Sequence, residues 1–186
     1  CLLSRGLGDV YKRQVCLICL LFSSSLLAQQ TRSVLFISSY HPGFPTFFDQ
    51  LAGLRDVLQE EDLRLDIEFL DSKRFASYED RFQRGLEYKL SALPSYDLII
   101  TADDAATWFA TQHRDSLFTD TPIVFFGVND TKFGLSFNQV PQVTGILEAT
   151  ANRETIETIH ALFGNDSPLY IITDATPTGQ LDFQRF

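Results

Sequence analysis

Polar and charged side chains follow the short apolar runs of this sequence, at the points where β-strands would end. The candidates for ligand binding are Ser39, Tyr40, His41, Asp71, Lys73, Asp103, Asp104, Asn129, Asp174 and Thr178. In an open parallel sheet, ligands bind beyond the carboxyl ends of the strands, so these side chains are expected along one rim. The pattern therefore predicts a cleft for a small polar solute.

Each residue type suggests a role in such a cleft. Tyr40 is expected to stack on or cover the ligand, while Ser39 and the backbone near His41 donate hydrogen bonds. Asp103 and Asp104 are expected to orient a polar or cationic group, helped by the start of the helix that follows them. Asn129 would contribute an amide, and Thr178 would face it across the cleft.

The same residues have purely structural interpretations. Asp103 and Asp104 precede a predicted helix and could serve only as caps that accept backbone N–H bonds. Asp71 could be a turn former, with Lys73 and Arg74 as a solvated pair. His41 could simply pack in a turn beside Pro42.

Sequence motifs of enzymes are absent. The chain has no G-x-S-x-G elbow, no G-x-x-x-x-G-K-[ST] or G-x-G-x-x-G loop, and no H-E-x-x-H pair. Its three histidines are far apart, so neither a metal site nor a cofactor is expected. Asp103 and Asp104 are sequence neighbours at a helix start, which does not give the facing geometry of an acid–base pair.

Charge and composition narrow the partners. The formal net charge is −9, which argues against nucleic acid because phosphate neutralisation needs clustered Lys and Arg. All three cysteines lie within the first 19 residues, so the rest of the chain can form neither a disulfide nor a cysteine metal site.

The first 28 residues do not resemble part of a fold. The chain has no Met, and residues 1–14 look like translated adapter sequence. The apolar run VCLICLLF, followed by SSSLLA, resembles a signal peptide that would export the protein to the periplasm. An uncleaved membrane anchor is the alternative interpretation of this leader.

The remaining chain alternates between apolar runs and amphipathic segments. Strands are predicted over 33–38, 63–70, 97–102, 122–128, 143–147 and 169–173. Helices are predicted over 47–58, 78–93, 104–118 and 152–163, with another beginning near residue 178. This alternation predicts an α/β fold, a Rossmann-like parallel sheet with flanking helices. The strictly alternating run at 63–70 is expected at or near a sheet edge, and the irregular stretch 129–142 near a hinge.

Six segments resemble those of one family in the same order. They are SSYHPGFP (38–45), FLDSKRF (69–75), YDLIITADDAA (96–106), PIVFFGVND (122–130), VTGILE (143–148) and YIITDATPTG (170–179). The family is the substrate-binding-like domains of the type I periplasmic-binding-protein superfamily, and the closest branch is the extracytoplasmic sensor of bacterial histidine kinases and diguanylate cyclases.

The resemblance implies two Rossmann-like lobes that close on a solute. Residues 33–145 would form most of the first lobe, and residues 148–186 would begin a second lobe whose remainder, with any membrane signalling module, is missing. A sensory ligand-binding domain is the first expectation, a free solute-binding protein that serves an ABC permease is the second, and an α/β enzyme is the least expected.

Overall fold

The computed structural model describes residues 31–58, 63–75, 79–166, 168–175 and 177–185. Arg32–Phe186 forms one compact unit. The predicted adapter sequence and signal peptide at 1–28 lie outside the described residues. Within the described residues, no helix is both long and apolar enough to span a bilayer.

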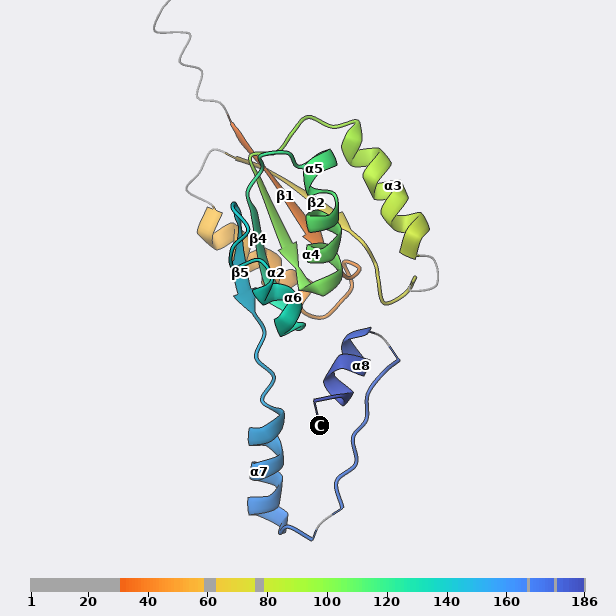
Figure 1. The fold of residues 1–186 in the computed structure, drawn as a ribbon, viewed down its shortest axis with the longest axis vertical. Coiled ribbons are helices and arrows are strands. Elements are labelled where there is room, and N and C mark those ends of the chain that lie inside the picture. The colour runs from red at the N-terminus through yellow and green to blue at the C-terminus, as the bar shows by residue number, and fades with distance from the viewer. Residues whose placement is uncertain (1–30, 59–62, 76–78, 167, 176, 186) are drawn as a thin grey trace, which may run out of the picture. The chain divides into compact units, whose positions relative to one another are not determined.

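The fold is built on a five-stranded sheet in which every pair of neighbouring strands is parallel (Figure 1). The strand order is β2-β1-β3-β4-β5. The strands are β1 (Arg32–Ser38), β2 (Leu63–Phe69), β3 (Leu98–Ala102), β4 (Ile123–Val128) and β5 (Val143–Leu147). This arrangement confirms the predicted α/β, Rossmann-like fold.

Alternate residues of β1 build two separate cores. Leu35 and Ile37 face one cluster of buried side chains, and Val34 and Phe36 face the other. A strand that is covered on both faces must be apolar at every position, which explains the unbroken runs of β1 and β3. The predicted edge strand is confirmed, because β2 is the outermost strand and its residues are half-buried or exposed.

Helices on both faces of the sheet supply the other half of each core. α2 (Phe47–Leu58) buries Phe47 and Leu51 against the Phe36 side. α3 (Glu79–Ser91) and α4 (Asp103–Gln112) pack on the Leu35 side, where Leu86, Leu90 and Phe109 are buried. α3 and α4 lie together on one side of the sheet in Figure 1.

Two local predictions need correction. The single helix expected over 104–118 is divided at His113 into α4 and α5 (Arg114–Leu117). His113 leaves the helical conformation, with ψ at 12°, and its ring packs 4.6 Å from that of Phe109. The irregular stretch 129–142 contains a short helix, α6 (Thr131–Leu135), because the carboxylate of Asp130 caps it by accepting the N–H of Phe133 at 3.1 Å.

The predicted sixth strand, Leu169–Thr173, is wrong for this structure. The segment carries no strand hydrogen bonds, and Tyr170 and Ile172 are 83% and 96% exposed. A strand exists only through bonds to a neighbour, and no strand within the described residues pairs with this one. The flanking helices α7 (Asn152–Phe163) and α8 (Pro177–Phe183) match the two helices expected there.

Candidate functional site

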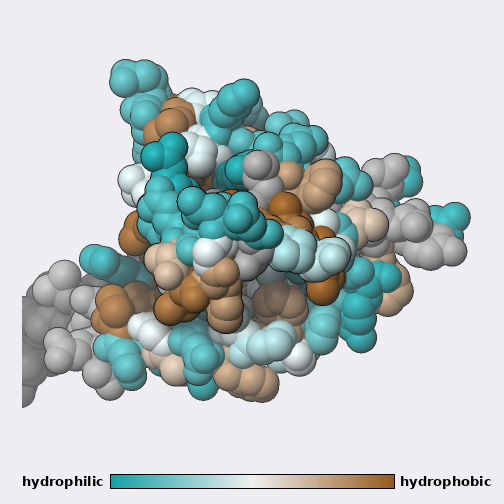
Figure 2. Space-filling view, turned by 90° about the horizontal axis from the view of Figure 1, so that it is seen from below, coloured by the Kyte–Doolittle hydropathy of each residue, from teal (hydrophilic) through white to brown (hydrophobic). Residues whose placement is uncertain are grey.

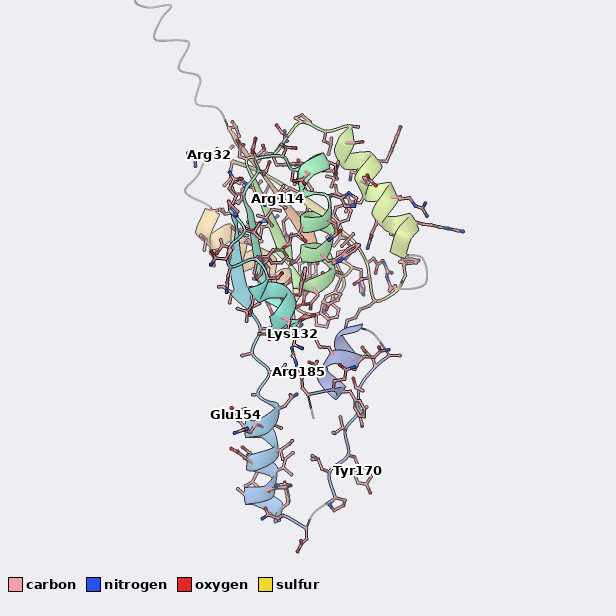
Figure 3. The ribbon with its side chains drawn as sticks, in the orientation of Figure 1. Arg32, Arg114, Lys132, Glu154, Tyr170 and Arg185 are labelled. Atoms are coloured by element: carbon pink, nitrogen blue, oxygen red, sulfur yellow. The ribbon has the colours of Figure 1, made fainter. Side chains whose placement is uncertain are left out.

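The predicted rim lies at the carboxyl ends of β1, β3 and β4. Strand order reverses direction between β1 and β3, which is where open parallel sheets bind ligands. In Figure 3, Lys132, just beyond β4, and Arg185 lie toward this end of the sheet, and Arg32, at the start of β1, lies at the other end.

Ser39 joins β1 to the start of α4 at this switch point. Its side chain is fully buried, its hydroxyl donates to the carbonyl of Ala102 at 2.7 Å, and it accepts the N–H of Ala106 at 2.8 Å. The Ser39 carbonyl also accepts both the N–H and the hydroxyl of Ser72, at 2.9 and 2.8 Å. In the structure this hydroxyl therefore joins β1, β3 and α4 through hydrogen bonds. The sequence predicted that it would instead contact the ligand directly.

Asp104 also has a positioning role. Its two carboxylate oxygens accept the backbone N–H groups of Asn129 and Asp130, at 3.1 and 2.9 Å. These bonds tie the first turn of α4 to the end of β4. The helix N-cap is Ala102, without a side-chain cap hydrogen bond, so neither predicted aspartate occupies the cap position.

Asp103, by contrast, keeps a carboxyl group that faces other ionisable side chains. The residue is 9% exposed and its φ is +69°, in the left-handed region that Asp tolerates better than most residues. Burial, with Glu148 and Asp104 nearby, raises the pKa of Asp103 to about 7, against the opposing effects of a hydrogen bond from Tyr40 and the charge of Lys73. The Asp103 carboxyl therefore changes its protonation state near neutral pH.

Two aromatic rings and a lysine complete this part of the rim. Tyr40, 8% exposed, lies with its ring centroid 4.2 Å from that of Phe44. The ammonium of Lys73 lies 5.1 and 5.4 Å from the Tyr40 and Phe44 centroids, within the range of a cation–π interaction. The same ammonium lies 3.6 Å from a carboxylate oxygen of Asp174.

Asp71 and His41 have local partners at the edge of this group. The Asp71 carboxylate accepts both Nε and Nη2 of Arg74, and its φ is +52°, as in the turn that one interpretation predicted. The hydrogen bond with Asp71 raises the pKa of Arg74. His41 accepts the N–H of Gly43 at 3.1 Å through Nδ1, so its imidazole shapes the turn after β1.

The predicted residues of β4 and of the C-terminal segment lie at the side of this group. Asn129 is buried, its side-chain amide donates to the carbonyl of Gly127 at 3.3 Å, and its own carbonyl accepts the guanidinium of Arg185. Asp174 is linked to the rim by its ion pair with Lys73. Thr178 belongs to α8, but its side chain lies outside the described part of the chain.

Sequence reasoning missed Glu148 and Phe44. Glu148 follows β5, and its N–H donates to the carbonyl of Val128 at 2.9 Å, so it belongs to the same edge of the sheet. The strand-end rule that selected the other candidates would have found it had it been applied to the fifth strand. Phe44 lies in the turn after β1, and no pattern in the sequence distinguishes it from the other aromatic residues there.

The candidate site combines Tyr40, Phe44, Lys73, Asp103, Glu148 and Asp174 on a surface of mixed polarity. In the view from below in Figure 2, hydrophobic patches lie among hydrophilic residues. Two cavities, of about 220 and 350 Å³, are lined by other residues, along β5 and α6 and between β2 and α3. Among the described residues, no group of three His, Asp or Glu side chains could hold a metal ion.

Comparison of the chain with protein-family models, with curated proteins and with solved structures finds no match. The fold and the site geometry therefore carry the functional argument.

Proposed function

We propose that this chain is an extracytoplasmic binding domain for a small polar solute that carries a cationic group, and that the cation lies against Asp103. The observation that carries the proposal is the buried Asp103 carboxyl at the strand-order switch point, beside the paired rings of Tyr40 and Phe44. A carboxylate beside aromatic rings is a suitable environment for an ammonium or guanidinium.

The electrostatics of the site favour a cation over an anion. Lys73 faces Asp174, and Arg74 faces Asp71, so these basic groups already have acidic partners. Burial raises the pKa of Asp103 to about 7, and the nearby charges of Glu148 and Asp104 contribute to this rise. A cationic ligand would relieve that repulsion, whereas an anionic ligand would increase it.

The export and signalling parts of the proposal rest on the sequence. The leader-like apolar run, and cysteines confined to the first 19 residues, support an extracytoplasmic location. The resemblance of six segments to the sensor branch supports a role as the input domain of a membrane-bound kinase or cyclase. In such a role the ligand shifts the population of lobe arrangements toward the one it binds more tightly.

Isothermal titration calorimetry of the purified chain tests the binding proposal. The probes are L-arginine, putrescine and choline as cations, with succinate and glucose as anionic and neutral comparisons. Binding of a cationic probe requires ionised Asp103, so affinity should rise about tenfold between pH 6 and pH 8, the range that spans a pKa of about 7.

Asp103→Asn sharpens the test, because Asn also tolerates a positive φ whereas Ala would add backbone strain. We expect this variant to bind cationic probes about 10- to 100-fold more weakly, with the pH dependence gone. Asp56→Asn, at an exposed position of α2, is the matched control and should behave as the parent chain does. Unchanged affinity in Asp103→Asn, preference for succinate, or turnover of a probe would each overturn the proposal.

A further inference from the structure

Lys73 occupies the part of the site that suits a cation best. Its ammonium lies over two aromatic rings, 5.1 Å from the centroid of Tyr40 and 5.4 Å from that of Phe44. The Lys73 side chain is 31% exposed, whereas Tyr40 is almost fully buried beneath it. When no ligand is present, the Lys73 ammonium makes the cation–π interactions with these rings that a ligand cation would make.

The same ammonium has a second attachment on a different part of the chain. Asp174 lies 3.6 Å away, and its own side chain is 53% exposed. Lys73 follows β2, whereas Asp174 follows the exposed segment 168–173, so the ion pair joins two segments about a hundred residues apart. Lysine has a flexible four-carbon stem, which lets its ammonium move between rings and carboxylate without backbone change.

We propose that Lys73 is a tethered competitor for the cation position of this site, and that Asp174 is the group that holds it aside when a cationic ligand binds. This inference rests on the proposed function. It makes Lys73 and Asp174 determinants of affinity: the lysine weakens the binding of cations, and the aspartate lessens that effect. It also predicts that the Lys73–Asp174 contact shortens when a ligand is bound.

Substitutions at the two positions should act in opposite directions. Lys73→Met keeps the apolar stem and removes the charge, so affinity for the cationic probes should rise about tenfold, as expected when a neighbouring like charge is removed from a partly buried site. Asp174→Asn frees Lys73 to stay on the rings, so affinity should fall several-fold. In the double variant, affinity should equal that of Lys73→Met, because Asp174 acts through the lysine.

Lys132→Met is the matched control, since it removes the same charge from an exposed residue at the same end of the sheet (Figure 3). Solvent and salt screen an exposed charge more strongly than a partly buried one, so its effect should be small. Calorimetry with L-arginine, putrescine and choline measures all four variants. A rise in affinity on Lys73→Met cannot come from damage to the fold.

The outcomes separate this inference from the proposed function. If the parent chain binds none of the cationic probes, the proposed function fails first. If it binds one and Lys73→Met binds it equally or more weakly, Lys73 is not a competitor and the inference is overturned. A double variant that binds more weakly than Lys73→Met overturns the role given to Asp174.

Discussion

At the scale of single residues, the two neighbouring aspartates after β3 have different tasks. Asp104 binds two backbone N–H groups from the end of β4, and this interaction needs its negative charge. Asp103 is buried with Tyr40 and close to other carboxylates, where its charge is unfavourable. Because the backbone φ of Asp103 is +69°, the side chains of these two neighbouring aspartates point in different directions and lie in different environments.

The sequence placed both aspartates at the rim but could not separate their roles. Both are aspartates in the first turn of the same helix, and the left-handed conformation at Asp103 decides that Asp104 accepts the N–H groups that follow β4. Ser39 shows the same limit, because its position after β1 was predictable whereas its burial beneath α4 depends on how α4 packs. For such residues the deciding contacts come from segments between 25 and 67 positions away.

The raised pKa of Asp103 predicts a pH-dependent stability. The folded pKa of about 7 lies above the unfolded value near 3.9, so the native state binds more protons between these values. The free energy of unfolding should therefore fall as pH rises from 4 to 7 and level off above 7, by at most about 4 kcal/mol at 1.4 kcal/mol per pKa unit.

Urea denaturation at pH 5, 6, 7 and 8 measures this slope. Asp103→Asn should remove the contribution, so that the variant gains stability relative to the parent chain as pH rises. Asp56→Asn should leave the parent slope intact. If the parent and Asp103→Asn lose stability equally from pH 5 to pH 7, the carboxyl is not destabilised by ionisation in the folded state.

Gly127 gives a second residue-scale prediction. Its φ is +69°, and a Cβ there would lie 3.6 Å from Oδ1 of Asp103, an ordinary contact. Gly127→Ala should therefore lower the free energy of unfolding by about 1–2 kcal/mol through backbone strain rather than through a clash.

Gly53→Ala is the control for this effect. Gly53 lies within α2, and nothing lies within 4 Å of a Cβ added there, so Ala should stabilise the chain by about 0.5–1 kcal/mol. Thermal unfolding of the two variants side by side should give shifts of opposite sign. A Gly127→Ala variant as stable as the parent would mean that the backbone at 127 is not held in the left-handed region.

At the scale of elements, the turn after β1 is fastened by side-chain hydroxyls to β3 and α4. Ser39 both donates to Ala102 and accepts from Ala106 in a fully buried position. Ser39→Ala removes the partner of the buried Ala106 N–H and one of the two donors to the Ala102 carbonyl. We therefore expect a loss of about 1–3 kcal/mol in the free energy of unfolding. Ser91→Ala is the matched control, since that hydroxyl donates to Tyr88 at the surface and should cost less than about 0.5 kcal/mol.

Denaturant titrations of the two serine variants measure this difference in the free energy of unfolding. Equal stabilities would mean that the Ser39 hydroxyl does not help to hold the start of α4. A large loss in Ser39→Ala would support the view that this hydroxyl fixes the start of the helix that carries Asp103.

Elements with a strong period were predictable, and short or unpaired ones were not. Four apolar runs and the alternating run at 63–69 became the five strands, because strands covered on both faces or at an edge leave distinct patterns. α6 was missed because five residues are too few to show a helical period, and only its Asp130 cap reveals it. Leu169–Thr173 has a strand's composition, but composition cannot supply the neighbouring strand that would pair with it.

At the scale of the whole molecule, the strand order β2-β1-β3-β4-β5 brings polar residues from distant parts of the sequence together in one site. The crossover from β2 to β3 passes β1 and places the turns after β1 and β3 side by side, and β4 and β5 extend the same edge toward Glu148. The two cores on either face of the sheet hold this edge rigid, since β1, β3 and β4 each have buried apolar residues along their length.

The cores end before the C-terminal segments, which gives the last prediction. Ile99 on β3 is fully buried, whereas Ile172 is 96% exposed, and α7 buries none of its residues. Ile99→Ala should therefore lower the free energy of unfolding by about 2–5 kcal/mol through the cavity it leaves. Ile172→Ala should change it by no more than about 0.5 kcal/mol.

Urea denaturation of the two alanine variants compares the loss of a buried isoleucine with the loss of an exposed one. A cost above about 2 kcal/mol for Ile172→Ala would mean that residues 168–173 are buried in solution, and the sheet would then share its stability with them. If the prediction holds, the sheet with its rim is the cooperative unit. Lys73–Asp174 is then a contact between that unit and a segment that can move without unfolding it, as the competitor role of Lys73 requires.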